Sequence, residues 1–239
     1  IARDRPVHTG QRRTVAPAFT PSEMVRMSDD IRRRTAEILD SLPWNTRFDW
    51  VDTVSIELTT QMLAILFDFP WEERRKLTYW SNVATTNPKA PGALITSEEE
   101  RFTVLRQMAA EMTGLWNERV NAPPKFDLIS MLAHGESTRE MTPMEFMGNC
   151  VLLIVGGNDT TRNSISGGLL ALNQFPAEYE KLRQNPSLIP SMVSEIVRWQ
   201  TPLAYMRRTA TRDTELGGKQ IKGGDKLAMW YISGNRDEE

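Results

Sequence analysis

The feature that most constrains this chain is an apolar run between residues 146 and 172 that contains no proline. Apolar residues occur on all sides of its first half, which is typical of a helix buried at the centre of a large all-α domain. Thr142 and Glu145 have the spacing of a capping box, and Pro143 suits the first helical position. We therefore predict a long central helix over about residues 142–173.

The middle of this predicted helix contains residues that destabilise helices. Gly156 and Gly157 each cost roughly 1 kcal/mol of helix propensity relative to alanine, and the four polar residues 158–161 follow them. The pattern fits a continuous helix with a functional groove, where glycine leaves room for a flat ligand beside the carboxylate of Asp159 and the hydroxyl of Thr160. In that case the Thr160 hydroxyl bonds the Gly156 carbonyl one turn back. The pattern also fits a break between two shorter helices, capped by one of the polar residues.

Further helices are predicted by apolar spacing along the rest of the chain. They are expected over residues 21–42, 49–67, 71–84, 97–120, 127–134, 176–182 and 191–199. Residues 135–140 are expected to form an exposed loop. From Leu203 the period changes and Gly-Gly pairs separate short runs, so about residues 203–233 are predicted to be β-rich. The fold class is therefore mainly α with a small β region.

The charge balance limits the classes of partner. The 239 residues include 29 Lys and Arg against 31 Asp and Glu, a net charge of −2, which argues against a nucleic-acid surface. No stretch reaches the roughly 18 consecutive apolar residues of a membrane span, and the first residues do not resemble a signal peptide. We expect a soluble, cytoplasmic protein without a nucleic-acid partner or a transmembrane segment.

Two pairs of charged residues have helical spacing. His8 and Arg12 stand four residues apart, so on one helix face they can bind an anion together, although an ordinary surface pair has the same spacing. Glu195 and Arg198 stand three apart within a predicted helix and are expected to pair.

Taken in order, four motifs resemble the cytochrome P-450 monooxygenases. They are His-x-x-x-Arg at 8–12, Gly-Gly-x-Asp-Thr-Thr at 156–161, Glu-x-x-Arg at 195–198, and Arg-x-Ala-x-x-Asp-x-Glu-x-Gly at 208–217 leading to Gly-Asn-Arg-Asp at 234–237. Segments 48–63 and 194–208 further resemble the bacterial medium-chain alkane hydroxylases of this family. The resemblance covers the whole chain and implies a single, partial cytochrome P-450 domain over residues 1–239.

The resemblance implies haem, an iron protoporphyrin, as the cofactor. It implies that His8, Arg12 and Arg208 bind the haem propionates, whose charge the cations neutralise, and that Gly156 lies against the haem. Glu195 and Arg198 match a pair that ties its helix to the loops below the haem, which is a structural role.

The resemblance also implies the catalytic and substrate-binding residues. Asp159 and Thr160 match an acid–alcohol pair, in which Thr160 hydrogen-bonds dioxygen and Asp159 helps deliver protons through water. Further apolar residues are expected to face haem or substrate: Leu152, Val155, Leu203, Ala204 and Met206.

One departure concerns the metal ligand. The family's ligand is a cysteine in a glycine-rich loop downstream of Asn235, and this sequence stops at Glu239, so no residue of the chain is predicted to bind the iron. The single cysteine, Cys150, lies ten residues before Thr160, about 15 Å along a helix, and is expected to be a buried, inert thiol. We therefore expect an internal fragment that is inactive by itself and exposes apolar surface where absent parts pack.

Three functions follow as hypotheses. The first is hydroxylation of an aliphatic chain, at the terminal carbon of a medium-chain alkane, with dioxygen and with electrons from NADH or NADPH through a ferredoxin reductase and a ferredoxin. The second keeps the fold and changes the substrate to a fatty acid, terpene or steroid, because an apolar pocket does not distinguish one hydrocarbon from another. The third is a non-catalytic helical binding or scaffold protein.

Overall fold

Side-chain caps begin several helices at the residues where the sequence places them. In the structure, a computed structural model that describes residues 4–238, the Thr20 hydroxyl accepts the third backbone N–H of its helix at 3.4 Å. Ser97 and Asp127 do the same at 3.1 and 2.7 Å. Thr142 and Glu145 form the predicted capping box, with reciprocal bonds of 3.3 and 3.0 Å. These caps satisfy N–H groups that have no partner within the helix.

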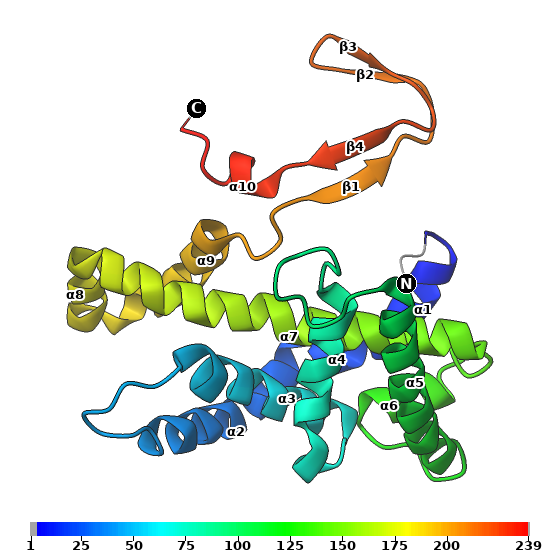
Figure 1. Cartoon of the computed structure of the whole chain (residues 1–239), viewed down its shortest axis with the longest axis horizontal. Coiled ribbons are helices and arrows are strands. Elements are labelled where there is room, and N and C mark those ends of the chain that lie inside the picture. The colour runs from blue at the N-terminus through cyan, green and yellow to red at the C-terminus, as the bar shows by residue number, and fades with distance from the viewer. Residues whose placement is uncertain (1–3, 239) are drawn as a thin grey trace. The chain divides into compact units, whose positions relative to one another are not determined.

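The chain divides into two units that meet between Arg162 and Asn163, and each is described by itself. The first unit is helical (Figure 1). Its helices are α1 (Val7–Val15), α2 (Pro21–Asp40), α3 (Glu57–Phe67), α4 (Arg75–Thr85), α5 (Glu98–Val120), α6 (Leu128–His134) and the first part of α7 (Pro143–Gln174). The helices predicted from apolar spacing are therefore confirmed, with ends shifted by one or two residues in most cases.

The core of the first unit lies among α3, α4, α5, α6 and α7. Its fully buried side chains include Phe67, Leu77, Met112, Leu132 and Ile154, each at most 1% exposed. Burial of such a side chain stabilises a fold by roughly 1.5–3 kcal/mol, so this contact set holds the helices around α7.

Short irregular turns adjoin three of these helices. Ala16–Phe19 forms a 3-10 turn before α2, and Trp71–Glu73 forms another before α4. Val51–Ile56 forms a π-helical turn at the start of the helix predicted from residue 49. The turns at residues 51–56 and 71–73 fall inside helices predicted from apolar spacing, which does not distinguish them from α-helix because they keep side chains at nearly helical intervals.

The predicted exposed loop over residues 135–140 is wrong at Thr138, which is fully buried. Its hydroxyl donates to the Leu132 carbonyl at 2.6 Å, so it satisfies an acceptor at the end of α6. A β-carbon on Gly135 would lie 2.4 Å from the Thr14 side chain, so α1 packs directly on this loop.

The central helix is continuous. α7 runs without interruption from Pro143 to Gln174, a length of 32 residues, so the alternative of two shorter helices is wrong. The Thr160 hydroxyl donates to the Gly156 carbonyl at 3.3 Å, as predicted. Packing of the apolar faces outweighs the poor helix propensity of residues 156–161.

The second unit begins in α7 and adds α8 (Pro176–Gln184), the 3-10 turn Pro186–Leu188, α9 (Ile189–Gln200) and α10 (Tyr231–Gly234). Two glycines of α7 let α9 approach closely. A β-carbon on Gly167 would lie 2.1 Å from Gln200, and one on Gly168 would lie 2.7 Å from Ile196. A larger residue at either position would require the facing α9 side chain to move.

The β-rich segment forms two antiparallel pairs. The strands are β1 (Met206–Thr209), β2 (Thr214–Leu216), β3 (Lys219–Ile221) and β4 (Lys226–Met229). β1 pairs with β4, and β2 pairs with β3 across Gly217 and Gly218, whose φ angles of 57° and 73° suit glycine. The extension of β structure to residue 233 is wrong, because N–H groups of Gly234 and Asn235 bond back to carbonyls four residues earlier and close helical turns.

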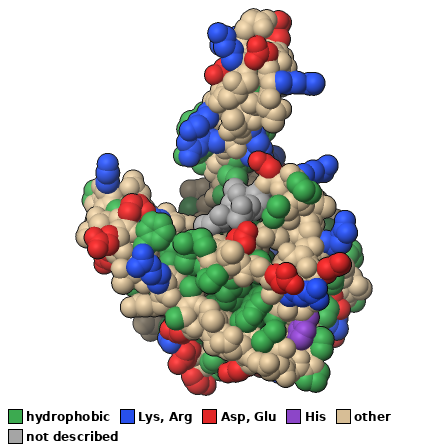
Figure 2. All heavy atoms as spheres, turned by 90° about the vertical axis from the view of Figure 1, so that its right-hand side faces the viewer, with side chains coloured by type: hydrophobic (Ala, Val, Ile, Leu, Met, Phe, Trp, Pro, Cys, Tyr) green, Lys and Arg blue, Asp and Glu red, His purple; other side chains and the backbone are tan. Residues whose placement is uncertain are grey.

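Apolar side chains are exposed in the part of the chain that the structure describes. The most exposed are Trp44 at 90% and Val25 at 73%, and Figure 2 shows hydrophobic side chains gathered between charged ones on one face. Exposed apolar side chains are therefore present, and that further parts of the protein pack on them stays a prediction. Among residues 4–238, no helix is long and apolar enough to cross a membrane.

Candidate functional site

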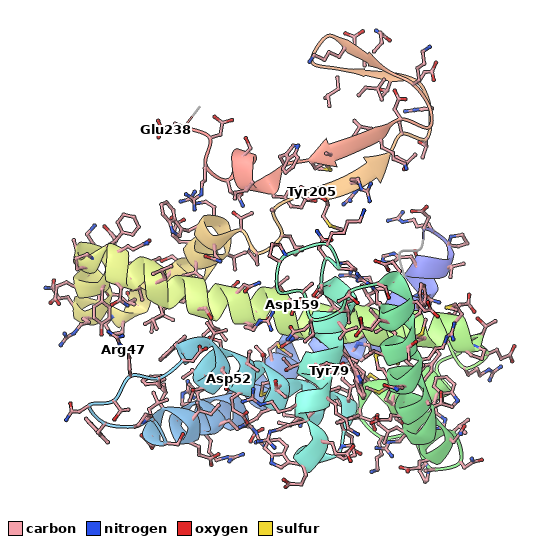
Figure 3. All side chains as sticks on the ribbon, viewed as in Figure 1. Arg47, Asp52, Tyr79, Asp159, Tyr205 and Glu238 are labelled. Carbon is pink, nitrogen blue, oxygen red and sulfur yellow. The ribbon has the colours of Figure 1, made fainter. Side chains whose placement is uncertain are left out.

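The carboxylate of Asp159 is held by four hydrogen-bond donors where α7 passes α4 (Figure 3). Its Oδ1 accepts from the Ser81 hydroxyl at 3.1 Å, the Asn158 amide at 3.1 Å and the Arg162 guanidinium at 3.0 Å. Its Oδ2 accepts from the Thr85 hydroxyl at 3.1 Å. A carboxylate with this many donors is fixed in one orientation.

A second layer of contacts holds the donors themselves. Arg162 also donates to the Asn82 side chain at 3.0 Å, and the fully buried Asn158 accepts from the Thr59 hydroxyl at 3.1 Å. This network joins α7 to α3 and α4. Because buried polar groups are costly without partners, the network fixes the register of the three helices around Asp159.

Sequence reasoning missed the contribution of α4. The sequence does contain a signal for this contribution, because Ser81 and Thr85 place two hydroxyl groups one helical turn apart. Their helix is otherwise apolar on its buried side, with Leu77, Trp80 and Val83. Such a pair on one face indicates a polar partner on a neighbouring helix. The partner was not identifiable without the packing of α4 on α7.

The two central glycines have different surroundings. A β-carbon on Gly157 would lie 2.6 Å from Cδ2 of the buried Leu63 in α3, whereas a β-carbon on Gly156 would meet no heavy atom within 4 Å. Gly157 therefore serves helix packing, and Gly156 leaves an open turn on the other side of α7.

The open turn is bordered by apolar side chains and by Thr160. Leu152, one turn before Gly156, is 49% exposed, and Val155 is half-buried. Residues 152, 156 and 160 follow at intervals of four, so they form one stripe along α7. The structure thus brings together five predicted site residues on one helix: Leu152, Val155, Gly156, Asp159 and Thr160.

His8 and Arg12 lie on α1 with both side chains exposed. Within residues 4–238, no ion pair is found between either side chain and a carboxylate. Their predicted role as a binding pair stays a prediction.

The remaining predicted ligand contacts belong to the second unit. Leu203, Ala204 and Met206 are exposed at or just before β1, and Arg208 in β1 donates to the Arg207 carbonyl at 2.9 Å. That these residues meet the same ligand as α7 stays a prediction.

Glu195 and Arg198 form the ion pair that their spacing predicts. Two guanidinium nitrogens of Arg198 bond the carboxylate at 2.7 and 2.5 Å, and a third nitrogen donates to the Asn235 carbonyl. The hydrogen bond and the charge of Arg198 lower the pKa of Glu195 below its ordinary value. The pair therefore links α9 to the turn after α10, as a structural role requires.

Cys150 is fully buried in the core of the first unit. Burial raises the pKa of its thiol well above the ordinary value, so it stays protonated and unreactive. The expectation of a buried thiol is confirmed.

A groove of about 610 Å³ lies within the second unit, between the end of α7, α8 and α9. Its lining is mostly apolar and includes Phe175, Leu182, Met192 and Trp199, together with Glu195. It contains none of the predicted catalytic or substrate-contacting residues, so it does not replace α7 as the candidate site.

Comparisons with known proteins agree on one family. The sequence model described as cytochrome P-450 matches residues 12–239. Linalool 8-monooxygenase of Pseudomonas putida is 36% identical over 241 residues, and the alignment covers all of this chain and 58% of that protein. The methyl-branched lipid omega-hydroxylase of Mycobacterium tuberculosis is 34% identical, with 56% of its length covered.

Two solved structures are more similar in sequence. Cytochrome P-450-153 from Novosphingobium aromaticivorans is 59% identical with a TM-score of 0.89, covering 99% of this chain and 57% of that one. CYP153D17 from Sphingomonas sp. PAMC 26605 is 64% identical with a TM-score of 0.89, covering 99% and 58%. The chain thus spans somewhat more than half the length of these relatives.

Proposed function

Because the chain belongs to the cytochrome P-450 family, we propose that the whole protein is a haem-dependent monooxygenase that hydroxylates an aliphatic chain. Residues 1–239 then belong to one domain of that enzyme, and the substrate is a medium-chain alkane attacked at its terminal carbon. The open turn of α7 beside Thr160 carries this proposal, because a β-carbon on Gly156 would meet no heavy atom within 4 Å and the apolar Leu152 is exposed one turn earlier.

The residues present fit one face of a haem. Gly156 leaves an open turn in which a flat ring system meets no side chain within 4 Å of the missing β-carbon. His8 and Arg12 supply cations of the kind that bind propionates. The buried thiol of Cys150 points into the core and does not offer a ligand for iron. We therefore assign α7 to the face on which dioxygen and substrate bind.

The residues of α7 then have separate tasks. When bound, haem supplies the activation of dioxygen and the transfer of one oxygen atom to carbon. The Thr160 hydroxyl bonds dioxygen, and its distance of 3.3 Å to the Gly156 carbonyl is long enough for the hydroxyl to exchange that partner. Asp159 would help deliver protons through water toward the dioxygen that Thr160 bonds.

The electron source completes the proposal. Each hydroxylation needs two electrons, and the resemblance to alkane hydroxylases supports their delivery from NADH or NADPH through a ferredoxin reductase and a ferredoxin. A cytoplasmic location stays a prediction.

A second substrate class is supported by the names of two relatives. One acts on linalool, a terpene alcohol, and the other on the omega position of methyl-branched lipids. The first name describes a monooxygenase and the second a hydroxylase, and both substrates carry aliphatic chains. The alternative is therefore the same reaction on a terpene or fatty acid.

The test is to express the full-length protein with haem and to supply a ferredoxin and its reductase. With carbon monoxide, the reduced enzyme should show the Soret band shifted far to the red that thiolate-ligated haem gives. Octane, octanoic acid and linalool are then compared at equal concentration, and terminal alcohol from octane should be the main product. Faster turnover of linalool or octanoic acid would assign the second class, and a full-length protein that binds no haem would favour the scaffold hypothesis.

A further inference from the structure

The Thr85 hydroxyl has one proton and three acceptors, of which the Asn82 carbonyl is the most distant at 3.4 Å. Its Oγ1 lies 2.9 Å from the Ser81 carbonyl and 3.1 Å from Asp159 Oδ2. A hydroxyl donates one hydrogen bond and accepts up to two. It therefore donates to one of these oxygens at a time, and it switches between them by rotating its hydrogen while the heavy atoms stay in place.

The two carboxylate oxygens of Asp159 accept different numbers of hydrogen bonds, and this difference decides which oxygen can take up a proton. Oδ1 accepts from three donors, namely Ser81, Asn158 and Arg162. A proton on Oδ1 would compete with these three donors for the lone pairs of the oxygen. Arg162 remains protonated, so it cannot become an acceptor for that proton. Oδ2 has only the Thr85 hydroxyl among the contacts found for it in residues 4–238. Protonation of Asp159 is therefore directed to Oδ2.

Thr85 can form a hydrogen bond with Oδ2 in both the charged and the protonated form of Asp159. When Asp159 is charged, the Thr85 hydroxyl donates to Oδ2. When Oδ2 carries a proton, that proton donates to Thr85 Oγ1, and the hydroxyl turns to donate to the Ser81 carbonyl. In both states the hydrogen bond between Thr85 Oγ1 and Oδ2 is kept, with its direction reversed, so Oδ2 retains this partner.

Thr85 also lies on the solvent side of Asp159. Thr85 is exposed at the end of α4, whereas the Asp159 side chain is 17% exposed. A water molecule can therefore reach Thr85 Oγ1 and complete a path from solvent to Oδ2.

We propose that Thr85 is the relay through which Asp159 takes up protons from solvent. The hydroxyl passes its proton to Oδ2 and receives a replacement from water, so the net change is one proton moved from solvent to the carboxylate. Ser81 and Arg162 act as positioning residues that keep Oδ1 an acceptor. This inference rests on the proposed role of Asp159 and adds the route that supplies it.

The test compares Thr85→Val, which keeps the shape and removes the hydroxyl, with Thr85→Ser, which restores it. Thr86→Val is the matched control, because the Thr86 hydroxyl donates to the Asn82 carbonyl at 2.6 Å. In the full-length haem enzyme, Thr85→Val should raise the ratio of hydrogen peroxide to alcohol about tenfold and enlarge the solvent isotope effect. Loss of a catalytic acid lowers the reaction rate roughly 10²- to 10⁴-fold. The effect expected here is smaller, because water can partly replace the Thr85 hydroxyl. Thr85→Ser and Thr86→Val should both resemble the wild type.

An infrared titration tests the contact without turnover. The C=O band of protonated Asp159, identified by its loss in Asp159→Asn, should shift in Thr85→Val and return in Thr85→Ser. An unshifted band together with unchanged peroxide formation would overturn the relay. A peroxide defect in Thr85→Ser equal to that in Thr85→Val would also overturn it, because the side chain would then matter only for shape. If none of the three test substrates is hydroxylated, the proposed function fails, while the infrared band still decides whether Thr85 bonds the protonated acid.

Discussion

Gly157 lies so close to Leu63 that a β-carbon on the glycine would be 2.6 Å from Cδ2 of the leucine. Leu63 is 2% exposed in the core, so its side chain has little room to move aside. The adjacent Gly156 has open space in the same position. Gly157 thus allows α3 to pack closely on α7, whereas Gly156 leaves the surface of α7 uncovered.

This difference predicts opposite effects of alanine at the two positions. Overpacking costs about 1–3 kcal/mol, and alanine returns about 1 kcal/mol of helix propensity, so Gly157→Ala should lower the free energy of unfolding by about 1 kcal/mol. Gly156→Ala should raise it by up to about 1 kcal/mol and weaken haem or substrate binding. Urea unfolding of both variants checks this. Equal stabilities would contradict the assignment of packing to Gly157 alone.

Removing the Thr160 hydroxyl should uncouple the consumption of NADH from the formation of product. In Thr160→Ala, consumption of NADH by the reconstituted system should continue, while the fraction of electrons recovered as alcohol falls about tenfold or more and hydrogen peroxide rises. Thr161→Ala is the control, since the next residue along α7 faces another direction. The assignment of Thr160 fails if both variants retain wild-type yields of alcohol.

The pKa of Glu57 gives a pH-dependent contribution to stability. Burial would raise this pKa, but hydrogen bonds from Gln61 and Arg74 and the charges of Arg74 and Arg75 outweigh it, so the pKa lies below its ordinary value. Because the pKa is lower in the folded state, the contribution is present above the unfolded pKa and is lost as the pH falls through the folded pKa. The carboxylate side chain is 15% exposed.

Glu57→Gln should therefore destabilise the protein by roughly 1–3 kcal/mol at pH 7. The difference from the wild type should shrink in acid, below the ordinary pKa of glutamate. Urea unfolding of both proteins between pH 7 and pH 3 measures it. A difference that stays constant over this range would show that the charge of Glu57 contributes nothing.

The thiol of Cys150 should resist alkylation in the folded protein. It is fully buried, and burial raises its pKa, so neither access nor the thiolate form favours reaction. Mass spectrometry of the peptide that contains Cys150 should find it unmodified after iodoacetamide at neutral pH and fully modified after treatment in denaturant. Rapid modification without denaturant would show that α7 opens locally.

Sequence patterns predicted the helices well because each depends on spacing and caps within a few residues. The run over residues 146–172 and the capping box at Thr142 predicted the position of α7, although residues 156–161 also fitted a break between two shorter helices. The Thr160–Gly156 bond followed for the same reason, since both residues belong to one helix.

What the sequence could not show depends on residues far apart in the chain. Ser81 and Thr85 contact Asp159 across more than seventy residues, and no local pattern encodes that partner. The buried Thr138 was likewise hidden, because its partner is a carbonyl at the end of another helix. The separate roles of Gly156 and Gly157 needed the position of Leu63.

The boundary between the two units falls inside α7, between Arg162 and Asn163. Enzyme engineers who shuffle homologous genes commonly place crossover points at boundaries between compact units, and this position is such a boundary. A crossover there would nevertheless join the halves of one helix from different parents, only three residues from Asp159. The parental sequences would have to be identical over residues 156–168. Only then would the hybrid keep both Asp159 and the glycines Gly167 and Gly168 that contact α9.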